Sequence, residues 1–246
     1  MTPFFIALQF LTTFPIQLKT MPSPQQNGQS LLFYPVVGLL IGAILWAIAT
    51  LLHSLPIILL ASILLCTWIW LTGGLHLDGL ADTADAWVGG FGDKERTLTI
   101  MKDPSCGPIG VLSLVIICLL KWSAIYVLLQ QKMPLALFIF PVLGRIAPLI
   151  LFLTTPYVRK NGLGSALTEF IPKKSAIFLI IMCLIFPVIF SWIGIFSSLI
   201  FIFSLYYLRY KFMQRISGIT GDTVGASIEI LETVTLFCFV ILSFYF

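Results

Sequence analysis

The stretch PIGVLSLVIICLLKWSAIYVLLQ, residues 108–130, contains one charged side chain, Lys121. A helix crosses the hydrocarbon core of a bilayer with about 20 mostly apolar residues, so this stretch is long enough to span a membrane. Its apolar residues are continuous and do not alternate with polar ones, as they would in a strand of a membrane barrel. The stretch therefore predicts a transmembrane α-helix.

The rest of the 246-residue chain has the same character. Hydrophobic residues make up 59% of it, charged residues only 10%, and the mean hydropathy is +1.05. A soluble domain is about 25% charged, so this chain has too few polar groups to cover a surface in water. Disordered chains are excluded as well, because they combine low hydrophobicity with high charge.

Similar apolar runs recur along the whole chain. They cover residues 31–52, 56–77, 134–156, 175–193, 194–209 and 224–246. We therefore predict an all-α fold, a polytopic integral membrane helical bundle with about six or seven transmembrane helices, in a single domain 1–246. Residues 1–18 are also apolar, but they contain Pro3 and Pro15 and lack a positively charged start. They predict a re-entrant or interfacial helix rather than a cleaved signal peptide.

The basic residues are divided very unevenly between the two sides that these spans define. Eleven fall in loops on one side, Lys132 alone falls on the other, and Lys121 and Arg145 lie within spans. The eleven are Lys19, Lys94, Arg96, Lys102, Arg159, Lys160, Lys173, Lys174, Arg209, Lys211 and Arg215. Lys and Arg accumulate in cytoplasmic loops, so we expect a multi-pass protein of the cytoplasmic (inner) membrane with loops 78–107, 157–174 and 210–223 in the cytoplasm.

The segment TGGLHLDGLADTADA, residues 72–86, carries the most informative polar pattern. Asp78, Asp82 and Asp85 are spaced i, i+4, i+7, which places them within an arc of roughly 60° on one helix face. We expect this helix to continue directly from the span 56–77. At an effective dielectric near 20, neighbouring carboxylates about 6 Å apart repel one another by roughly 2–3 kcal/mol.

A divalent cation would remove this repulsion. Mg²⁺ binds carboxylate oxygens together with waters and substrate phosphates, so the pattern predicts a Mg²⁺ site at Asp78, Asp82 and Asp85, with Mn²⁺ as a substitute. A solvated amphipathic helix is the simpler alternative, but residues 78–92 contain no basic residue to balance the acids. Proton or cation transport is the other alternative.

A second acidic element, GDTVGASIE, spans residues 221–229. Asp222 stands just before an apolar run, where it would either cap the helix or serve as a fourth metal ligand or general base. Asp222 and Asp82 are the candidate catalytic carboxylates. Both acidic elements are expected at the same membrane face.

Several further residues are candidates for binding an anionic substrate. Gly73 and Gly74 allow either close helix packing or close approach of a phosphate. His76 lies about 160° around the helix from Asp78, so it is either a substrate contact or a packed histidine. The remaining candidates are Lys102, a point charge for a phosphate; Arg145, an intramembrane arginine suited to a pyrophosphate; and Gly162 and Gly164 in a short loop.

Four motifs occur in a characteristic order. They are GGLHLDGLADTAD at 73–85, MKD at 101–103, GLG at 162–164 and GDTVGA at 221–226. This order resembles the cobalamin synthase family, also called adenosylcobinamide-GDP ribazoletransferase, and the resemblance extends over essentially the whole chain. The family is also similar in chemistry to CDP-alcohol phosphotransferases, whose D-G-x-x-A-R motif fits at Asp78 and Gly79, although Ala81-Asp82 replaces the expected Ala-Arg register.

The resemblance implies a transferase that joins α-ribazole, or its 5′-phosphate, to adenosylcobinamide-GDP. GMP is released and adenosylcobalamin, or its 5′-phosphate, is formed in the last step of nucleotide-loop assembly. The implied partners are these two substrates and the lipid bilayer, with no nucleic acid and with a homo-oligomer left open. A membrane cation or proton-coupled transporter using the acidic cluster is the competing function. The acids are all expected near one face, however, whereas a conduction path needs polar groups across the membrane.

Overall fold

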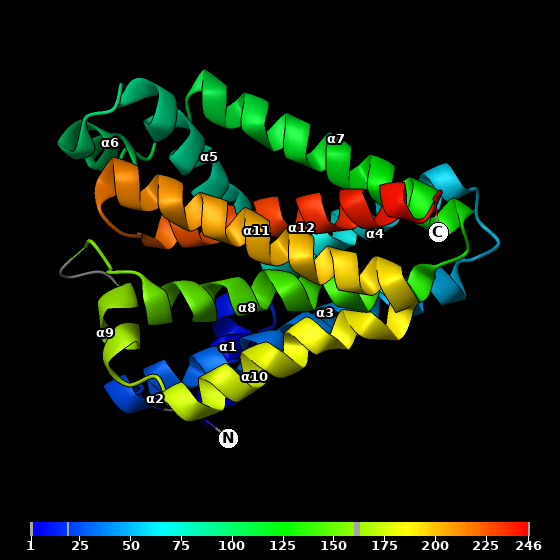
Figure 1. Ribbon diagram of the computed structural model, residues 1–246, viewed down its shortest axis with the longest axis horizontal. Coiled ribbons are helices and arrows are strands. Elements are labelled where there is room, and N and C mark those ends of the chain that lie inside the picture. The colour runs from blue at the N-terminus through cyan, green and yellow to red at the C-terminus, as the bar shows by residue number, and fades with distance from the viewer. Residues whose placement is uncertain (1, 19, 160–162, 246) are drawn as a thin grey trace.

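The computed structural model describes residues 2–18, 20–159 and 163–245, and no β-strand occurs among them. Figure 1 shows long helices lying side by side, with short helices gathered at one end. The helices are α1 Thr2–Leu11, α2 Pro24–Ser30, α3 Tyr34–Leu51, α4 Ile57–Thr72, α5 Leu75–Gly89, α6 Lys94–Ile100, α7 Pro108–Gln130, α8 Ile139–Thr154, α9 Leu163–Glu169, α10 Lys173–Ile185, α11 Ser191–Ile216 and α12 Gly221–Leu242. Three 3₁₀ turns join them: η1 Leu31–Phe33, η2 Pro134–Phe138 and η3 Phe186–Phe190.

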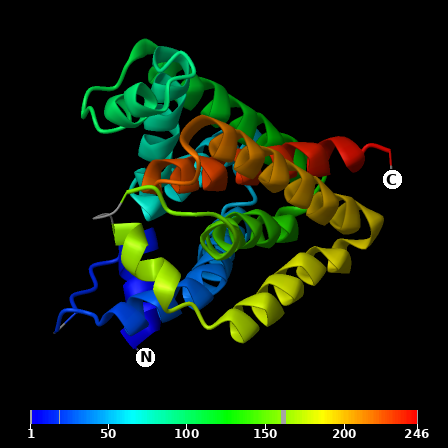
Figure 2. The ribbon, with the colours of Figure 1, turned by 60° about the vertical axis from the view of Figure 1, so that its left-hand side comes forward.

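The long helices match the apolar runs of the sequence. Within the described residues, five helical stretches are long and apolar enough to cross a membrane, or six if α4 and α5 count as one bent span. The longest stretch, 173–216, turns back on itself at η3, as Figures 1 and 2 both show. The prediction of an all-α polytopic membrane protein is thus confirmed.

Helix α1 is too short to cross a bilayer. Its ten residues extend about 15 Å, half the thickness of a hydrocarbon core. It packs against α2 and α3 and buries Ala7 and Leu11. The N-terminal segment therefore supports the bundle without adding a span, as its two prolines indicated.

The junction between α4 and α5 differs from the sequence prediction. Gly73 and Gly74 both adopt left-handed backbone conformations, with φ of 63° and 71°, and the two helix axes meet at 87°. A side chain disfavours this conformation by roughly 1–2 kcal/mol per residue, which glycine avoids. The expectation that the helix carrying Asp78 continues directly from the span 56–77 is wrong, because these two glycines break it.

After this bend, α5 packs closely against α12. A Cβ atom on Gly79 would lie 2.8 Å from the carbonyl oxygen of Asp222, so no larger residue fits there. On the opposing helix, a Cβ atom on Gly225 would lie 3.4 Å from the Cα of His76. The close approach of the two backbones brings both acidic elements of the sequence together.

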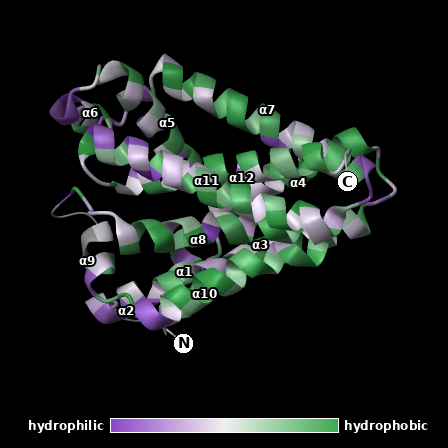
Figure 3. Cartoon of the chain, in the orientation of Figure 1, coloured by the Kyte–Doolittle hydropathy of each residue, from purple (hydrophilic) through white to green (hydrophobic). Residues whose placement is uncertain are grey.

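The two ends of the bundle differ in polarity. Figure 3 shows hydrophilic residues concentrated at the end that carries α2, α6 and α9, and Figure 1 places segments 78–107, 163–174 and 210–223 there together. Large apolar side chains such as Leu119, Phe178 and Phe203 are exposed along the outer faces of the helices, as contact with lipid requires.

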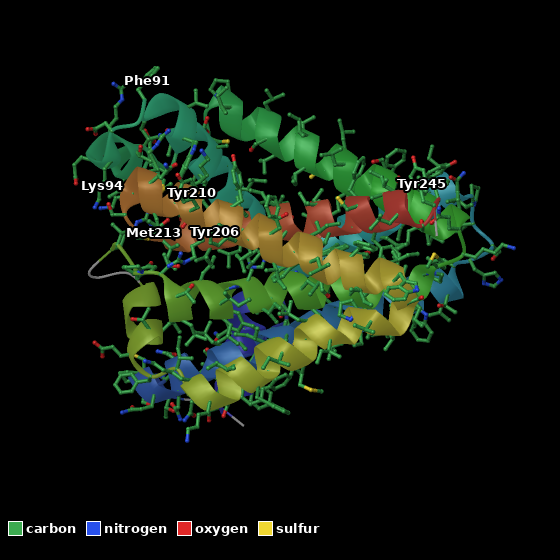
Figure 4. The ribbon with its side chains drawn as sticks, in the orientation of Figure 1. Phe91, Lys94, Tyr206, Tyr210, Met213 and Tyr245 are labelled. Carbon is green, nitrogen blue, oxygen red and sulfur yellow. The ribbon has the colours of Figure 1, made fainter. Side chains whose placement is uncertain are left out.

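Aromatic residues mark both ends of the apolar region. Figure 4 shows Tyr206 and Tyr210 on α11 at the end where Phe91 and Lys94 lie, and Tyr245 at the opposite end. All of these aromatic side chains are exposed. Tyrosine is enriched where a membrane meets water, so these residues bracket the part of the bundle that lies in the bilayer.

Candidate active site

A cavity of about 360 Å³ lies among α1, α2, α5, α8, α9 and α12. Most of its walls are apolar, from residues such as Ile6, Phe10, Leu11, Phe152 and Ile228. Its polar side chains are those of Asn27, Ser30, Tyr34, His76, Asp78, Tyr157, Arg159 and Asp222. Asp78 is exposed whereas His76 and Leu11 are buried, so the acidic residues lie towards the open side of the cavity.

Two carboxylates line this open side, and a third lies near them. Asp78 and Asp222 line the cavity from α5 and α12, and Asp82 lies one turn further along α5, where the charges of both act on it. We call Asp78, Asp82 and Asp222 the acidic cluster. The structure thus brings together the two acidic elements that the sequence placed at one face.

Arg159 is the cation that faces the acidic cluster. Its Nη2 donates a hydrogen bond of 2.6 Å to Oδ2 of Asp222, and a longer one of 3.4 Å to the carbonyl oxygen of Met101. Its Nε is buried and has no hydrogen-bond partner in the described part of the chain. The arginine therefore has a donor left for an anionic ligand.

Asp222 is not the cap of α12. Thr220 takes that position: its Oγ1 accepts from the backbone N–H of Thr223 at 3.2 Å, and Oγ1 of Thr223 accepts from the backbone N–H of Thr220 at 2.9 Å. Asp222 stands in the first turn, where the helix dipole favours a negative charge. The capping alternative for Asp222 is thus wrong, and its carboxylate is available to the site.

Asp85 has a different environment from the acidic cluster. Its two carboxylate oxygens accept hydrogen bonds from the backbone N–H groups of Gly107 and Gly110, at 2.7 and 2.8 Å. A Cβ atom on either glycine would lie within about 2.5 Å of the carboxylate, so both positions need glycine. Asp85 therefore ties α5 to the first turn of α7. Its role as a metal ligand stays a prediction, and a bound metal ion would have to replace these hydrogen bonds.

The acidic cluster has the donor chemistry for Mg²⁺ but is not a preformed cage. Within the described residues, no three His, Cys, Asp or Glu side chains converge closely enough to hold a metal ion. Mg²⁺ needs no such cage, because it commonly binds one or two carboxylates and completes its shell with waters and substrate phosphates. Two members of the acidic cluster would therefore suffice.

A second group of charges is buried between α7, α8 and α12. Nζ of Lys121 lies 2.6 Å from Oε2 of Glu229 and 2.9 Å from Oε2 of Glu232, and Nη1 of Arg145 pairs with Oε1 of Glu232. Lys121 also lies 4.6 Å from the centre of the Trp68 ring. We call Lys121, Arg145, Glu229 and Glu232 the buried ion network. Two positive and two negative charges balance, as burial in a bundle demands.

This network accounts for Arg145 without a substrate. The guanidinium is fully buried against Glu232 and does not line the cavity. Its predicted contact with a pyrophosphate stays a prediction. His76 is the candidate that the cavity favours most: it lines the wall, is 3% exposed, and neither ring nitrogen has a hydrogen-bond partner within the described chain.

The other predicted binding residues are scattered. Gly164 lines the cavity against the ring of Tyr157, whereas Gly162 lies outside the described residues. Lys102 is exposed and does not line the cavity. Gly73 and Gly74 do not line it either, and their observed role is the bend before α5.

Sequence reasoning missed two sets of contacts. The sequence placed Arg159 only among the basic loop residues of one side, and its pairing with Asp222 across the fold carries no local signal. The buried ion network did leave a signal in the sequence, because two acidic and two basic residues inside apolar spans must neutralise one another.

Comparison with known proteins places this arrangement in a family. The cobalamin-5-phosphate synthase profile matches residues 3–240. The chain belongs to this family. Membership makes the protein a membrane transferase of cobalamin biosynthesis, which confirms the resemblance seen in the motifs and sets the transporter alternative aside.

Curated relatives of the family match along nearly their full length. One from Acinetobacter baumannii is 62% identical over 245 residues, covering 100% of this chain and 99% of the relative. Others from Pseudomonas fluorescens and Stutzerimonas stutzeri are 49% and 50% identical and cover 96% of this chain and 98% and 96% of the relatives. All three are named adenosylcobinamide-GDP ribazoletransferase. No solved structure matches.

Proposed function

We propose that the protein joins α-ribazole, or its 5′-phosphate, to adenosylcobinamide-GDP at the acidic cluster. The 3′-hydroxyl of the ribazole attacks the phosphorus on the cobinamide side of the pyrophosphate. The new P–O bond forms as the bond to the bridging oxygen breaks, GMP leaves with that oxygen, and the hydroxyl proton passes to a base. The product is adenosylcobalamin or its 5′-phosphate.

One observation carries this proposal: Asp78, Asp222 and Arg159 line a cavity of nucleoside size, and Asp82 lies one turn along α5 from Asp78. Such a site supplies a proton acceptor for the hydroxyl and cationic contacts for the phosphates. No covalent enzyme intermediate is needed. Family membership supplies the kind of substrate, and the site supplies the chemistry.

The carboxylates have separable roles. Asp78 and Asp82 share one face of α5, and we propose that they hold Mg²⁺ together with the substrate phosphates. When bound, the ion would supply charge neutralisation of the pyrophosphate and of departing GMP. Asp222 reaches the cavity from the adjoining helix α12 and is the proposed base or the remaining ligand. The unpartnered Nε of Arg159 is the proposed donor to a phosphate oxygen.

We further propose that this site faces the cytoplasm. Lys19 and Lys160 lie outside the described residues, and the segments that carry the other nine basic residues of this side gather at the end of the bundle where α6 and α9 lie. Positively charged loops are retained on the cytoplasmic side of a bacterial membrane. Both proposed substrates are water-soluble compounds, which would meet the site from that side.

The test is release of GMP by the purified protein in lipid nanodiscs, given both substrates. We expect release with Mg²⁺ or Mn²⁺ and none in excess EDTA. Asp82→Asn should lower turnover by several orders of magnitude, whereas Glu95→Gln, an exposed acid on α6, should leave it unchanged. Full turnover in excess EDTA would exclude the metal, and turnover without Asp82 would exclude the acidic cluster.

A further inference from the structure

The cavity is built like a pocket for a flat aromatic ring. Phe10 stacks on Tyr34 with ring centres 6.3 Å apart, and Phe152 meets Tyr157 at 6.0 Å. All four rings line the cavity, between apolar side chains such as Leu11 and Ile228. Aromatic and apolar walls of this kind favour a planar heterocycle over a sugar or a phosphate.

Only a few polar groups interrupt these walls on the buried side. His76 is one, with both ring nitrogens buried and unpartnered among the described residues. A buried polar group without a partner is unusual in a native protein and calls for a ligand or water. The buried Ser30 and Tyr34 are two more, and the Ser30 hydroxyl already donates to the carbonyl oxygen of Asn27 at 2.7 Å.

Size and position restrict what can enter. A cavity of about 360 Å³ is at the small end of the ligand pockets of proteins, which run from about 300 to 1,000 Å³. It has room for a nucleoside and none for a corrinoid ring with its side chains. The acidic cluster and Arg159 stand on the open side, so a base held against His76 directs its ribose towards them.

We propose that this cavity is the subsite for the aromatic base of the ribazole substrate. The base lies between the aromatic walls, and His76 donates a hydrogen bond to the ring nitrogen that does not carry the ribose. The corrinoid and guanosine parts of the other substrate remain outside. The assignment rests on the proposed function and adds which substrate occupies the cavity and what recognises it.

Guanine is the competing occupant, because the second substrate carries it. Its edge presents several donors and acceptors, each of which needs a partner once buried. A benzimidazole presents a single ring nitrogen, which one imidazole N–H satisfies. The sparse polarity of the buried walls therefore favours the ribazole base.

The test compares two substrates that differ at one atom. One is α-ribazole 5′-phosphate, and the other is its indole analogue, in which a C–H replaces the free ring nitrogen and the ribose hydroxyl is retained. We expect the protein to prefer the first by about tenfold in kcat/KM, the effect of one neutral hydrogen bond. In His76→Leu this preference should fall to about one. His53→Leu, altered at an exposed histidine outside the cavity, should keep it.

A second variant tests the occupant of the cavity without a change at His76. Leu167 lines the cavity, and Leu167→Trp should fill part of it without touching the acidic cluster. We expect KM for the ribazole to rise about tenfold or more while KM for adenosylcobinamide-GDP is unchanged. The control is Leu119→Trp, on the exposed face of α7.

The outcomes separate the subsite from the reaction. If the unaltered protein releases no GMP with either ribazole, the proposed function is wrong. If it releases GMP but the preference is the same in His76→Leu, the base does not meet His76. If Leu167→Trp instead raises KM for adenosylcobinamide-GDP, the cavity holds guanosine and the assignment is overturned.

Discussion

Removing Lys121 should destabilise the protein through the two acids that it leaves behind. Lys121 is 3% exposed and contacts Glu229 and Glu232 at 2.6 and 2.9 Å. In Lys121→Met, Arg145 remains as the one cation of the buried ion network against two carboxylates. Breaking a buried ion pair by removing one partner typically costs about 3–5 kcal/mol.

The second half of this prediction is a rescue. Adding Glu229→Gln to Lys121→Met restores one positive and one negative charge, Arg145 with Glu232. We expect the double variant to recover most of the lost stability, because replacing a buried pair by neutral groups is often nearly neutral. Lys174→Met, at an exposed position on α10, should have no effect.

Thermal unfolding in detergent, followed by size-exclusion chromatography after heating, measures these changes. For a protein of this size, 3–5 kcal/mol corresponds to a fall of roughly 10 °C in Tm. If the double variant were no more stable than Lys121→Met, charge balance would not be what the network provides. The cost would then come from lost packing of the lysine stem against Trp68.

Three further outcomes follow from the site. Asp85→Ala should cost about 1–2 kcal/mol by uncapping α7 and should leave the Mg²⁺ requirement of the remaining activity unchanged, as a metal titration would show. Gly79→Ala should lower both Tm and turnover, because its Cβ atom meets the backbone of Asp222. Gly92→Ala, at a φ of 87° in an exposed loop, should lower Tm through backbone strain and retain full turnover. If Asp222 is the base, Asp222→Asn should lower the rate constant by about 10²–10⁴-fold at unchanged Mg²⁺ affinity. If Asp222 is a metal ligand, the same variant should raise the Mg²⁺ concentration that turnover requires. A variant with an unchanged rate constant and an unchanged Mg²⁺ requirement would exclude both roles.

The sequence predicted the spans well for a physical reason. A backbone in lipid must satisfy its own hydrogen bonds, so a long apolar run such as 108–130 has essentially one solution, a helix. The 87° bend was not predicted, because Gly73 and Gly74 suit close packing in a straight helix as well as a left-handed break. Only the rest of the bundle selects between the two.

The site was predictable in its acids and not in their partners. Periodicity placed Asp78 and Asp82 on one face, and the shared membrane side brought Asp222 towards them. The same periodicity included Asp85. Helical spacing does not show which neighbouring element packs on a face, however, and here the start of α7 packs against Asp85. The pairing of Arg159 with Asp222 joins distant parts of the chain, so no local pattern announced it.

The length of α11 ties the site to the thickness of the bilayer. Its 26 residues extend about 39 Å, longer than a typical hydrocarbon core of about 30 Å, so the helix must tilt or protrude. In its last turn, Arg215 donates to the carbonyl oxygen of Trp87 at 2.8 Å and lies over that ring, which belongs to α5. A change of membrane thickness that tilts α11 therefore moves Arg215, and with it the end of α5, the helix that carries Asp78 and Asp82. Turnover should vary with lipid chain length, and Arg215→Ala should weaken that dependence.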